Sequence, residues 1–418
     1  MAPLAAADQN RLVEAIRQSV PVDVTAAYDA STLRGKTVLI TGGSSGLGAA
    51  FARAWASHGA NIIIGDISSE AGQSVVADLR SSTSSAHHHF IHCDVTSWPS
   101  QAALFQRAVA LSPTGELDAV VASAGITDKF GAITGKGFEN PAHLDQPNPP
   151  APDLSCVQVN LIGVMYTAHL ALFWLQQNTP PDSQPPPAYV DTRDARDRHL
   201  LLIGSSAGLF VLPGIPQYIT AKHGVTGLFR SLRTLSYRQG IRVNMLCPYF
   251  VDTPILPTRA VAMLAGLGLA RLDDTVDAAT RLMAAPASTH DRIAGRALWI
   301  GPRMEFFKGK SVAALQAQDV TGEVLAAESV GDLAASGQGR QRREPRGQAV
   351  WEVYAHDYET ADYFVRRYLR LLNTIAQIKG WIGFWRELWH ALFVRKPKPP
   401  PPAGAAVPAT TAADVKMD

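Results

Sequence analysis

A serine, a tyrosine and a lysine in the middle of the chain have the types and the spacing of proton-transfer machinery. Tyr218 and Lys222 are four residues apart, so on a helix they share one face, one turn apart. An ammonium group there favours the phenolate over the phenol and lowers the pKa of the tyrosine. Ser205 ends a short apolar run, where its hydroxyl can meet the same substrate oxygen. Together the three side chains could move a proton to or from a C–OH/C=O pair.

The spacing Tyr-x-x-x-Lys arises by chance in many helices, so it does not identify an active site by itself. Other elements of the chain must indicate a cofactor site that would act together with this pair. A β-branched, apolar run at 37–40 is followed at once by a glycine-rich stretch at 41–48 and then by a helix-like stretch at 49–58. Strand, glycine-rich turn and helix are the beginning of a dinucleotide-binding unit. The free N–H groups at the start of that helix would then face the phosphates.

Three glycines of this loop have separate expected roles. Gly42 permits the tight turn, Gly46 lets the backbone approach a pyrophosphate, and Gly48 lets the helix pack closely. The spacing is Gly-x3-Gly-x-Gly rather than the commoner G-x-G-x-x-G. Ser44 and Leu47 of the same loop are further expected cofactor contacts.

An aspartate ends the second expected strand, at 61–66. Asp66 lies about where a carboxylate binds the adenosine ribose hydroxyls, although it could instead cap the next helix. Gly43 and Ile67 carry no positive charge for a 2′-phosphate, and the carboxylate would repel one. The sequence therefore favours NAD over NADP.

Two more strand ends supply expected cofactor contacts. Asp94 and Val95 end the third strand, where the carboxylate could reach the adenine amino group. Ala124 and Gly125 follow the fourth strand, where the backbone can approach the cofactor.

Strands and helices alternate along the chain with the period of a parallel sheet. Further strands are expected at 90–95, 117–122, 200–204 and 296–301. This alternation predicts an α/β fold with a doubly wound parallel sheet. Asn160 lies in an apolar helix at 154–177, so its amide needs a partner. A loop at 126–153 falls on the carboxyl side of the sheet, where ligands bind, and 254–285 is expected to form a lid over the substrate.

Composition limits the classes of function. A net charge of +2 gives no support for a nucleic-acid partner. Three cysteines, widely spaced and odd in number, form no disulfide framework and suit a reducing compartment. The N-terminus lacks the apolar segment of a secretory signal, so we expect a cytoplasmic protein. The run of histidines at 87–89 has no second ligand cluster at suitable spacing, so no metal is expected.

Together these motifs resemble the short-chain dehydrogenase/reductase family over roughly residues 35–305. Four motifs fall in the order of that family: the glycine-rich loop at 41–48; Asp66 and Asp94; the catalytic tetrad Asn160, Ser205, Tyr218 and Lys222; and the nicotinamide segment 248–253, with Val251 and Thr253 facing the carboxamide. The residues at 205–209 (Ser-Ser-Ala-Gly-Leu) and at 221–225 (Ala-Lys-His-Gly-Val) are similar to those of the 15-hydroxyprostaglandin dehydrogenase-like branch. That likeness implies a Rossmann fold and NAD-dependent oxidation of a lipophilic secondary alcohol.

The resemblance also implies a role for each member of the tetrad. Tyr218 would be the general base toward an alcohol, or the acid toward a ketone. Lys222 would lower the pKa of that tyrosine and contact the nicotinamide ribose. Ser205 would hydrogen-bond the substrate oxygen, and Asn160 would hold a water molecule that links Lys222 to solvent.

Two alternatives stay open, and three positions depart from the family pattern. The protein could run the reaction backwards as an NADPH-dependent ketone reductase, or it could be a cofactor-binding scaffold whose catalysis has lapsed. Ala122–Gly125 replaces the usual Asn-Asn-Ala-Gly, and Pro248-Tyr249 replaces the usual Pro-Gly. An insertion at 178–198 lengthens the gap between Asn160 and Ser205.

The expected domains are an N-terminal arm (1–34) with one helix at 8–20, the Rossmann-fold dehydrogenase domain (35–305), a linker (306–348), C-terminal helices (349–395) and a disordered Pro/Ala-rich tail (396–418). The first C-terminal helix is expected from Trp351 to Asn373. The second, at 375–394, carries an apolar stripe with three tryptophans. That stripe could pack on protein, or it could lie in a membrane interface as a peripheral anchor.

A homo-oligomer is expected because the helices that carry Asn160 and Tyr218 have apolar outer faces. Relatives in the family pair through these helices. The apolar residues concerned are Leu170, Leu172, Phe173, Leu228, Leu232 and Leu235.

Overall fold

The structure is a computed structural model that describes part of the chain. It describes residues 22–128, 137–177, 197–210, 213–233, 241–256, 268–284, 292–304 and 348–353, together with nine residues between 374 and 389. The chain divides into two compact units, Met1–Ala355 and His356–Asp418. Several predicted segments lie outside the described residues: the helix at 8–20, most of the insertion at 178–198, the linker at 306–347, the first C-terminal helix beyond Val353 and the tail at 396–418.

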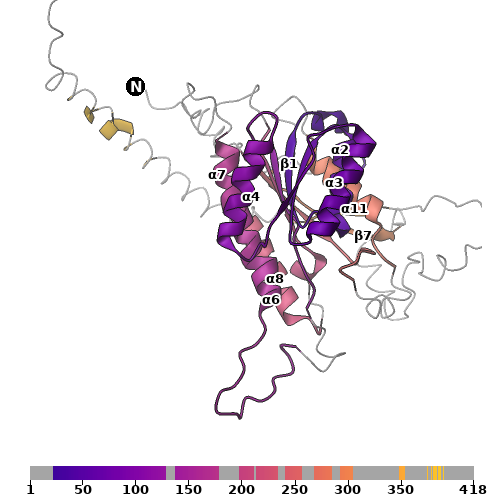
Figure 1. Ribbon diagram of the computed structural model, residues 1–418, viewed down its shortest axis with the longest axis vertical. Helices are drawn as coiled ribbons and strands as arrows, with labels where there is room; N and C mark the ends of the chain where they lie inside the picture. Colours follow the sequence, from indigo (N-terminus) through magenta and orange to yellow (C-terminus); the bar gives the residue numbers. More distant parts are fainter. Residues whose placement is uncertain are drawn as a thin grey trace, which may run out of the picture. The chain divides into compact units, whose positions relative to one another are not determined.

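The described part of the first unit is built around one eight-stranded sheet (Figure 1). Its strands are β1 (Thr37–Thr41), β2 (Asn61–Asp66), β3 (His89–His92), β4 (Ala119–Ala122), β5 (His199–Ile203), β6 (Arg242–Pro248), β7 (Ala297–Met304) and β8 (Gln348–Val353). The spatial order is β3-β2-β1-β4-β5-β6-β7-β8. All neighbouring pairs are parallel except β7 and β8, which are antiparallel. The doubly wound parallel sheet is therefore confirmed.

Helices cover both faces of the sheet, as Figure 1 shows. One face carries α2 (Gly46–Ser57), α3 (Ser69–Thr83) and α11 (Leu272–Met283), and the other carries α4 (Trp98–Leu111), α7 (Val164–Gln176) and α8 (Pro216–Leu232). Every residue of β1, β4, β5 and β6 is buried. Their continuous apolar runs fit strands that are covered on both sides.

Two expectations fail in the second half of the chain. We expected a lid at 254–285, but α11 occupies its later part and its Ala278, Ala279 and Leu282 are fully buried. Small side chains on one helical face allow this close packing, so α11 belongs to the core. Residues 257–267 lie outside the described part.

The predicted helix start at Trp351 is also wrong. Trp351 lies in β8, directly opposite Trp299 of β7, so the domain boundary expected at 349 falls inside the sheet. The pairing joins segments that are far apart in sequence, and local patterns do not report such a contact.

The N-terminal arm packs on the end of the sheet from residue 22 onward. The backbone N–H of Val22 donates to Glu352 Oε2 at 2.8 Å. Arg281 of α11 donates to the carbonyl of Ala26, and its guanidinium lies 4.7 Å from the ring centroid of Tyr28. This part of the arm is therefore a packing element.

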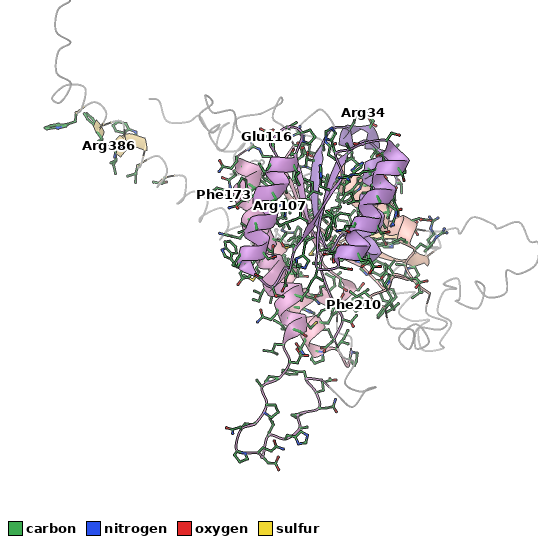
Figure 2. The ribbon with its side chains drawn as sticks, viewed as in Figure 1. Arg34, Arg107, Glu116, Phe173, Phe210 and Arg386 are labelled. Atoms are coloured by element: carbon green, nitrogen blue, oxygen red, sulfur yellow. The ribbon has the colours of Figure 1, made fainter. Side chains whose placement is uncertain are left out.

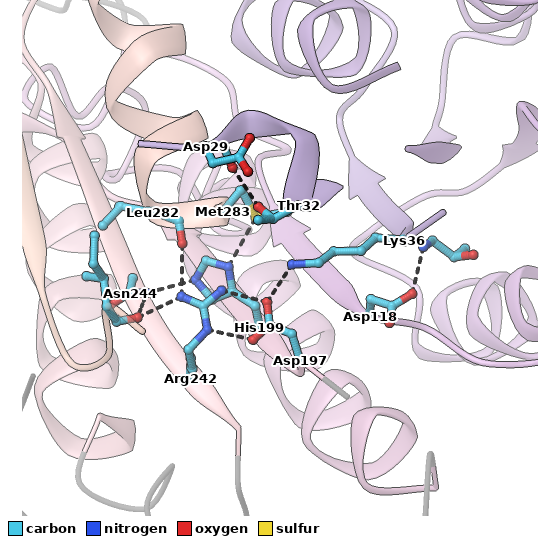
Figure 3. A network of polar contacts seen from close by, with 12 residues as sticks. Asp29, Thr32, Lys36, Asp118, Asp197, His199, Arg242, Asn244, Leu282 and Met283 are labelled. Carbon is cyan, nitrogen blue, oxygen red and sulfur yellow. Dashed lines mark hydrogen bonds and ion pairs between the residues drawn. The ribbon is translucent and has the colours of Figure 1, made fainter. Parts of the chain in front are cut away.

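A buried polar cluster fixes the amino ends of three strands (Figure 3). Asp197, before β5, accepts hydrogen bonds from Arg242 Nε at 2.7 Å, Arg242 Nη2 at 2.8 Å and Lys36 Nζ at 2.8 Å. Burial alone would raise the pKa of Asp197, but the charges and hydrogen bonds of Arg242 and Lys36 hold it well below its usual range. Burial lowers the pKa of the neighbouring His199 well below 6.5. Because the cluster lies at the amino ends, it supports the sheet from the side opposite to the expected ligand site.

The helical run from Ser155 to Gln176 is long and apolar enough to cross a membrane by length and composition alone. Its Ala168, Ala171 and Leu175 are nonetheless buried in the core beside the sheet. Leu170, which we expected on the outer face, is only 7% exposed, whereas Phe173 is 54% exposed and lies on the outside of α7 (Figure 2). The outer apolar face is therefore smaller than expected. Leu235, expected on the face of the other helix, lies outside the described residues.

In the second unit, the described residues of the tryptophan stripe are helical and exposed. Trp381 and Trp385 have ring centroids 6.4 Å apart. The exposed apolar residues are Ile378, Trp381, Ile382, Trp385 and Trp389. The surface that this stripe binds stays a prediction.

Candidate active site

A cavity of about 400 Å³ lies at the carboxyl ends of the parallel strands. Its walls come from the turns after β1, β2, β4, β5 and β6 and from the first turns of α2 and α8. Parallel α/β sheets bind their ligands at this edge. The cavity contains most of the residues that the sequence singled out, so it is the candidate active site.

Ser205, Tyr218 and Lys222 all line this cavity. Ser205 follows β5, and α8 begins at Pro216, so Tyr218 and Lys222 lie in its first two turns. Pro216 preorganises that helix start because its fixed φ suits the first helical position. The Ser205 hydroxyl accepts a hydrogen bond from the backbone N–H of Ala207 at 3.1 Å and lies close enough to the Tyr218 phenol to lower its pKa. The three groups are thus brought together as predicted.

The protonation of this pair differs from the simple expectation. Burial raises the pKa of Tyr218 above its ordinary value, and the neighbouring Ser205 hydroxyl offsets only part of that rise. Burial also lowers the pKa of Lys222 to about 8. The Lys222 ammonium lies 5.6 Å from the Tyr218 ring centroid. The expected net lowering of the tyrosine pKa is therefore wrong here, because burial penalises the charged forms of both groups.

Lys222 is tied to the strand that carries Ser205. Its Nζ donates to the carbonyl of Ile203 at 2.9 Å, and its side chain is buried. This contact holds the amine inside the cavity rather than in solvent. A lysine fixed in this way can contact both a cofactor ribose and the neighbouring phenol.

Asn160 does not line the cavity, and its side chain holds the loop after β4. Its Oδ1 accepts from the backbone N–H of Ile126 at 2.8 Å, and its Nδ2 donates to the carbonyl of Ile126 at 2.7 Å. It lies in a π-helical turn, η2 (Gln158–Gly163), a distortion that is frequent at functional sites. The amide is therefore satisfied structurally, and a water-holding role stays a prediction.

The glycine-rich loop is shaped as a phosphate cradle. Gly42 has φ +70°, and a Cβ there would lie 2.5 Å from Cα of Ala124. A Cβ at Gly48 would collide with the carbonyl oxygen of Gly42. These two positions therefore need glycine, for the turn and for close packing of α2 under it. The backbone N–H groups at the start of α2 face the cavity, which suits a pyrophosphate.

Asp66 is fixed at the end of β2 beside this loop. Its Oδ2 accepts from the backbone N–H of Ser44 at 3.0 Å, and its Oδ1 accepts from that of Ser68 at 3.0 Å. The helix-capping and ribose-binding interpretations are thus compatible, because a carboxylate has about four acceptor positions. Among the described residues that line the cavity, Lys222 is the single lysine or arginine.

The remaining expected cofactor contacts can be placed individually. Asp94 Oδ1 accepts from the backbone N–H of Thr96 at 2.9 Å and lines the cavity. The expected contacts that also line it are Gly46, Leu47, Val95, Ala124, Gly125, Val251 and Thr253. Ser44 is the exception: its side chain is buried and Ser45 lines the cavity in its place.

Sequence reasoning missed Asp128 and the apolar end of the cavity. Asp128 lines the cavity, and its Oδ2 accepts from the backbone N–H of Gln217 at 2.9 Å, one residue before Tyr218. It therefore anchors the helix that carries the tyrosine. The available signal was its place in the loop expected on the ligand side of the sheet, three residues after Gly125. Apolar residues that line the cavity include Val159, Ile215, Phe250, Ile255 and Leu256, and the last two belong to the segment at 254–285 that was expected over the substrate.

Within the histidine run at 87–89, His88 is buried and supports the neighbouring strand. His88 Nδ1 accepts from the backbone N–H of Ile62 at 3.2 Å, and burial lowers the pKa of His88 to about 4. His89 begins β3. Among the described residues, no group of histidine, cysteine and carboxylate side chains could hold a metal ion.

Several known proteins are similar to this chain. Residues 36–180 and 189–262 match the family model for short chain dehydrogenases. The chain is 37% identical over 287 residues to 5'-hydroxyaverantin dehydrogenase of Dothistroma septosporum (strain NZE10 / CBS 128990), covering 66% of this chain and 88% of the relative. It is 29% identical over 227 residues to 15-hydroxyprostaglandin dehydrogenase (NAD(+)) of Mus musculus, covering 54% and 70%. NADP-dependent dehydrogenase M3 of Phoma sp. (strain ATCC 20986 / MF5453) is 32% identical over 308 residues, covering 69% and 81%.

Among solved structures, that of levodione reductase matches with a TM-score of 0.51 at 22% identity, covering 64% of this chain and 96% of that one. This likeness concerns the fold alone. The family match and the relatives show that the chain belongs to the short chain dehydrogenase family. The protein is an NAD(P)-dependent oxidoreductase that acts on CH–OH groups.

Proposed function

We propose that this protein oxidises a lipophilic secondary alcohol with NAD. The observation that carries the proposal is the cavity itself. Its lining combines the Ser205–Tyr218–Lys222 group with the glycine-rich cradle and with apolar side chains. The apolar walls favour a substrate with little charge, because burying apolar surface stabilises the complex by about 25 cal/mol per Å².

Residues of this chain suit both the pyrophosphate and the adenosine ribose of NAD. The cradle beside Gly42 and Gly48 fits a pyrophosphate, and Asp66 fits the adenosine ribose. A bound nicotinamide supplies hydride acceptance, which is the chemistry of the cofactor itself.

Tyr218 takes the hydroxyl proton of the substrate, and the Ser205 hydroxyl donates a hydrogen bond to the substrate oxygen as charge develops. Lys222, in its protonated form, stabilises the phenolate. Asp128 acts indirectly, by anchoring the start of α8.

NAD is favoured because Asp66, the expected ribose contact, carries a negative charge that would repel a 2′-phosphate. The cavity offers no arginine among its described residues to neutralise such a phosphate. Some relatives are named as NADP-dependent, so the preference between NAD and NADP is to be measured directly. There are two alternatives: an NADPH-dependent ketone reductase and a cofactor-binding scaffold without catalysis. The presence of Ser205 and Tyr218 in one cavity argues against the scaffold.

A turnover assay tests the proposal. The full chain is incubated with NAD and a panel of lipophilic secondary alcohols that includes 5'-hydroxyaverantin, and NADH fluorescence is followed. The expected result is turnover with NAD that falls by about 10²–10⁴ in Tyr218→Phe, the usual share of a general base. Calorimetry should show NAD binding nearly unchanged in that variant.

Three results would contradict the proposal. Turnover of Tyr218→Phe within about threefold of the parent would remove the assigned base. Turnover that requires NADPH and the ketones would establish the reductase alternative, and no turnover in either direction would favour the scaffold.

The assembly and location of the protein are further parts of the proposal. The exposed Phe173 on α7 supports a homo-oligomer formed through this helix. The exposed tryptophans at 381, 385 and 389 support contact of the second unit with a membrane interface, because tryptophan is enriched there. Sedimentation with anionic vesicles tests this contact. The full chain should sediment and a chain ending at Gly347 or Val353 should not; if both stay in the supernatant, the stripe binds protein.

A further inference from the structure

Four aromatic side chains gather where β6 ends at the cavity. The ring of Tyr249 lies 4.7 Å from that of Phe250, 6.3 Å from that of Trp299 and 6.5 Å from that of Phe210, measured between centroids. The first two contacts are edge-to-face, with interplanar angles of 81° and 61°. Tyr249 and Phe250 line the cavity itself, and Phe210, which is labelled in Figure 2, is 41% exposed. We call these four residues the aromatic wall.

The aromatic wall is held rigidly against the catalytic group. Trp299 Nε1 donates to the Ser206 hydroxyl at 2.8 Å, and that hydroxyl donates to the carbonyl of Pro248 at 3.2 Å. The backbone N–H of Tyr249 donates to the carbonyl of Ile300 at 2.7 Å. Ser206 directly follows Ser205, so these hydrogen bonds hold the aromatic wall next to the residue whose hydroxyl is proposed to bind the substrate oxygen.

Tyr249 directly follows Pro248 at the end of β6 and lines the cavity. A glycine would leave this part of the cavity open, whereas the tyrosine adds a ring that stays partly exposed. Partly exposed rings that line a cavity are available to a ligand. The faces of aromatic rings carry negative charge and their edges carry positive charge, so they prefer another aromatic ring over a saturated one.

We propose that the aromatic wall is a subsite for an aromatic ring system carried by the alcohol substrate, with Tyr249 as its specificity-determining residue. This inference rests on the proposed function, because it names the class of substrate for the same cavity. The ring would lie against Tyr249 and Phe250 while the carbinol oxygen lies at Ser205 and Tyr218.

Two alcohols of matched shape test the subsite. They are 1-(2-naphthyl)propan-2-ol and its fully saturated decahydronaphthyl analogue, whose methylene spacer keeps the ring from activating the carbinol. The parent protein should show about a tenfold higher kcat/KM for the naphthyl alcohol, which corresponds to about 1.4 kcal/mol. Tyr249→Leu should reduce this ratio to below about threefold, and Tyr249→Phe should preserve it.

Binding measurements keep the subsite and the proposed function apart. Dissociation constants of both alcohols, measured by calorimetry with the intact chain, should show the same preference for the naphthyl ring. If no alcohol is turned over but this preference exists and depends on Tyr249, the proposed function fails and the subsite is supported. If both alcohols are oxidised equally well, the subsite is wrong and the proposed function stands.

Two further results would overturn the subsite. One is an unchanged ratio in Tyr249→Leu and also in Phe250→Leu, a second variant that covers poor folding of the first. The other is a weaker affinity of Tyr249→Leu for NAD with an equal loss of kcat/KM for both alcohols, because the wall would then support the nicotinamide instead of the substrate.

Discussion

The sharpest prediction concerns the carboxylate that we expect to reject NADP. Asp66 is held by two backbone N–H groups, those of Ser44 and Ser68, each at 3.0 Å. It therefore cannot turn away from a 2′-phosphate without losing these hydrogen bonds. Replacing it with asparagine removes the charge and keeps one acceptor oxygen for the loop, so Asp66→Asn is a cleaner change than Asp66→Ala.

The size of the effect follows from the charges. Two unit charges about 5 Å apart repel by about 3 kcal/mol at the effective dielectric constant of about 20 that applies near protein surfaces. Asp66 is partly exposed, so solvent and salt reduce this repulsion to about 2 kcal/mol. That is about a thirtyfold preference for NAD in the dissociation constants.

Calorimetry of NAD and NADP with the parent and with Asp66→Asn measures this preference. We expect the parent to bind NAD about thirtyfold more tightly and the variant to bind the two cofactors within about threefold. Asp94→Asn is the matched control, because Asp94 lines the cavity but is expected at the adenine. A parent that prefers NADP, or a variant with the same preference as the parent, would refute the reasoning.

The remaining predictions concern protonation, stability and assembly. Because burial lowers the pKa of Lys222 to about 8, its labelling by cyanate, followed by mass spectrometry, should have a midpoint near pH 8; a midpoint near 10.5 would contradict this. Asp197→Asn leaves two buried cations without their carboxylate and should lower the free energy of unfolding in urea by about 3–5 kcal/mol at pH 7. Since the folded pKa of Asp197 lies below its unfolded value of about 3.9, the difference between parent and variant should persist down to about pH 4 and shrink below it; an equal difference at pH 2.5 would be inconsistent with this. Phe173→Lys should shift an oligomer toward monomer in light scattering at micromolar concentration, and a parent that is already monomeric would exclude the proposed assembly.

The local motifs of this protein could be predicted because each depends on residues that are close in sequence. The turn at Gly42 and Gly48, the strand that ends at Asp66 and the helical pairing of Tyr218 with Lys222 all follow from such neighbours. The alternation of strands and helices then predicted the parallel sheet. Parallel strands bring their carboxyl ends to one edge of the sheet. Motifs that follow these strands at separate places in the sequence therefore line one cavity.

Contacts between distant segments could not be predicted in this way. The pairing of β8 with β7 joins residues on either side of a long intervening segment, so Trp351 was assigned to a helix. The burial of α11 depends on the sheet face beneath it, and an apolar stretch by itself fits a lid equally well. The two hydrogen bonds between Asn160 and Ile126 likewise depend on how η2 meets the turn after β4.

The sequence by itself identified the candidate catalytic residues, because types and spacing are enough to place a phenol, an amine and a hydroxyl on neighbouring elements. Only the tertiary structure decided their protonation and their surroundings. The pKa of Tyr218 rises rather than falls because the folded chain removes it from water, which no spacing reports. The ring of Tyr249 likewise becomes a wall of the cavity only where β6, β7 and the turn after β5 meet.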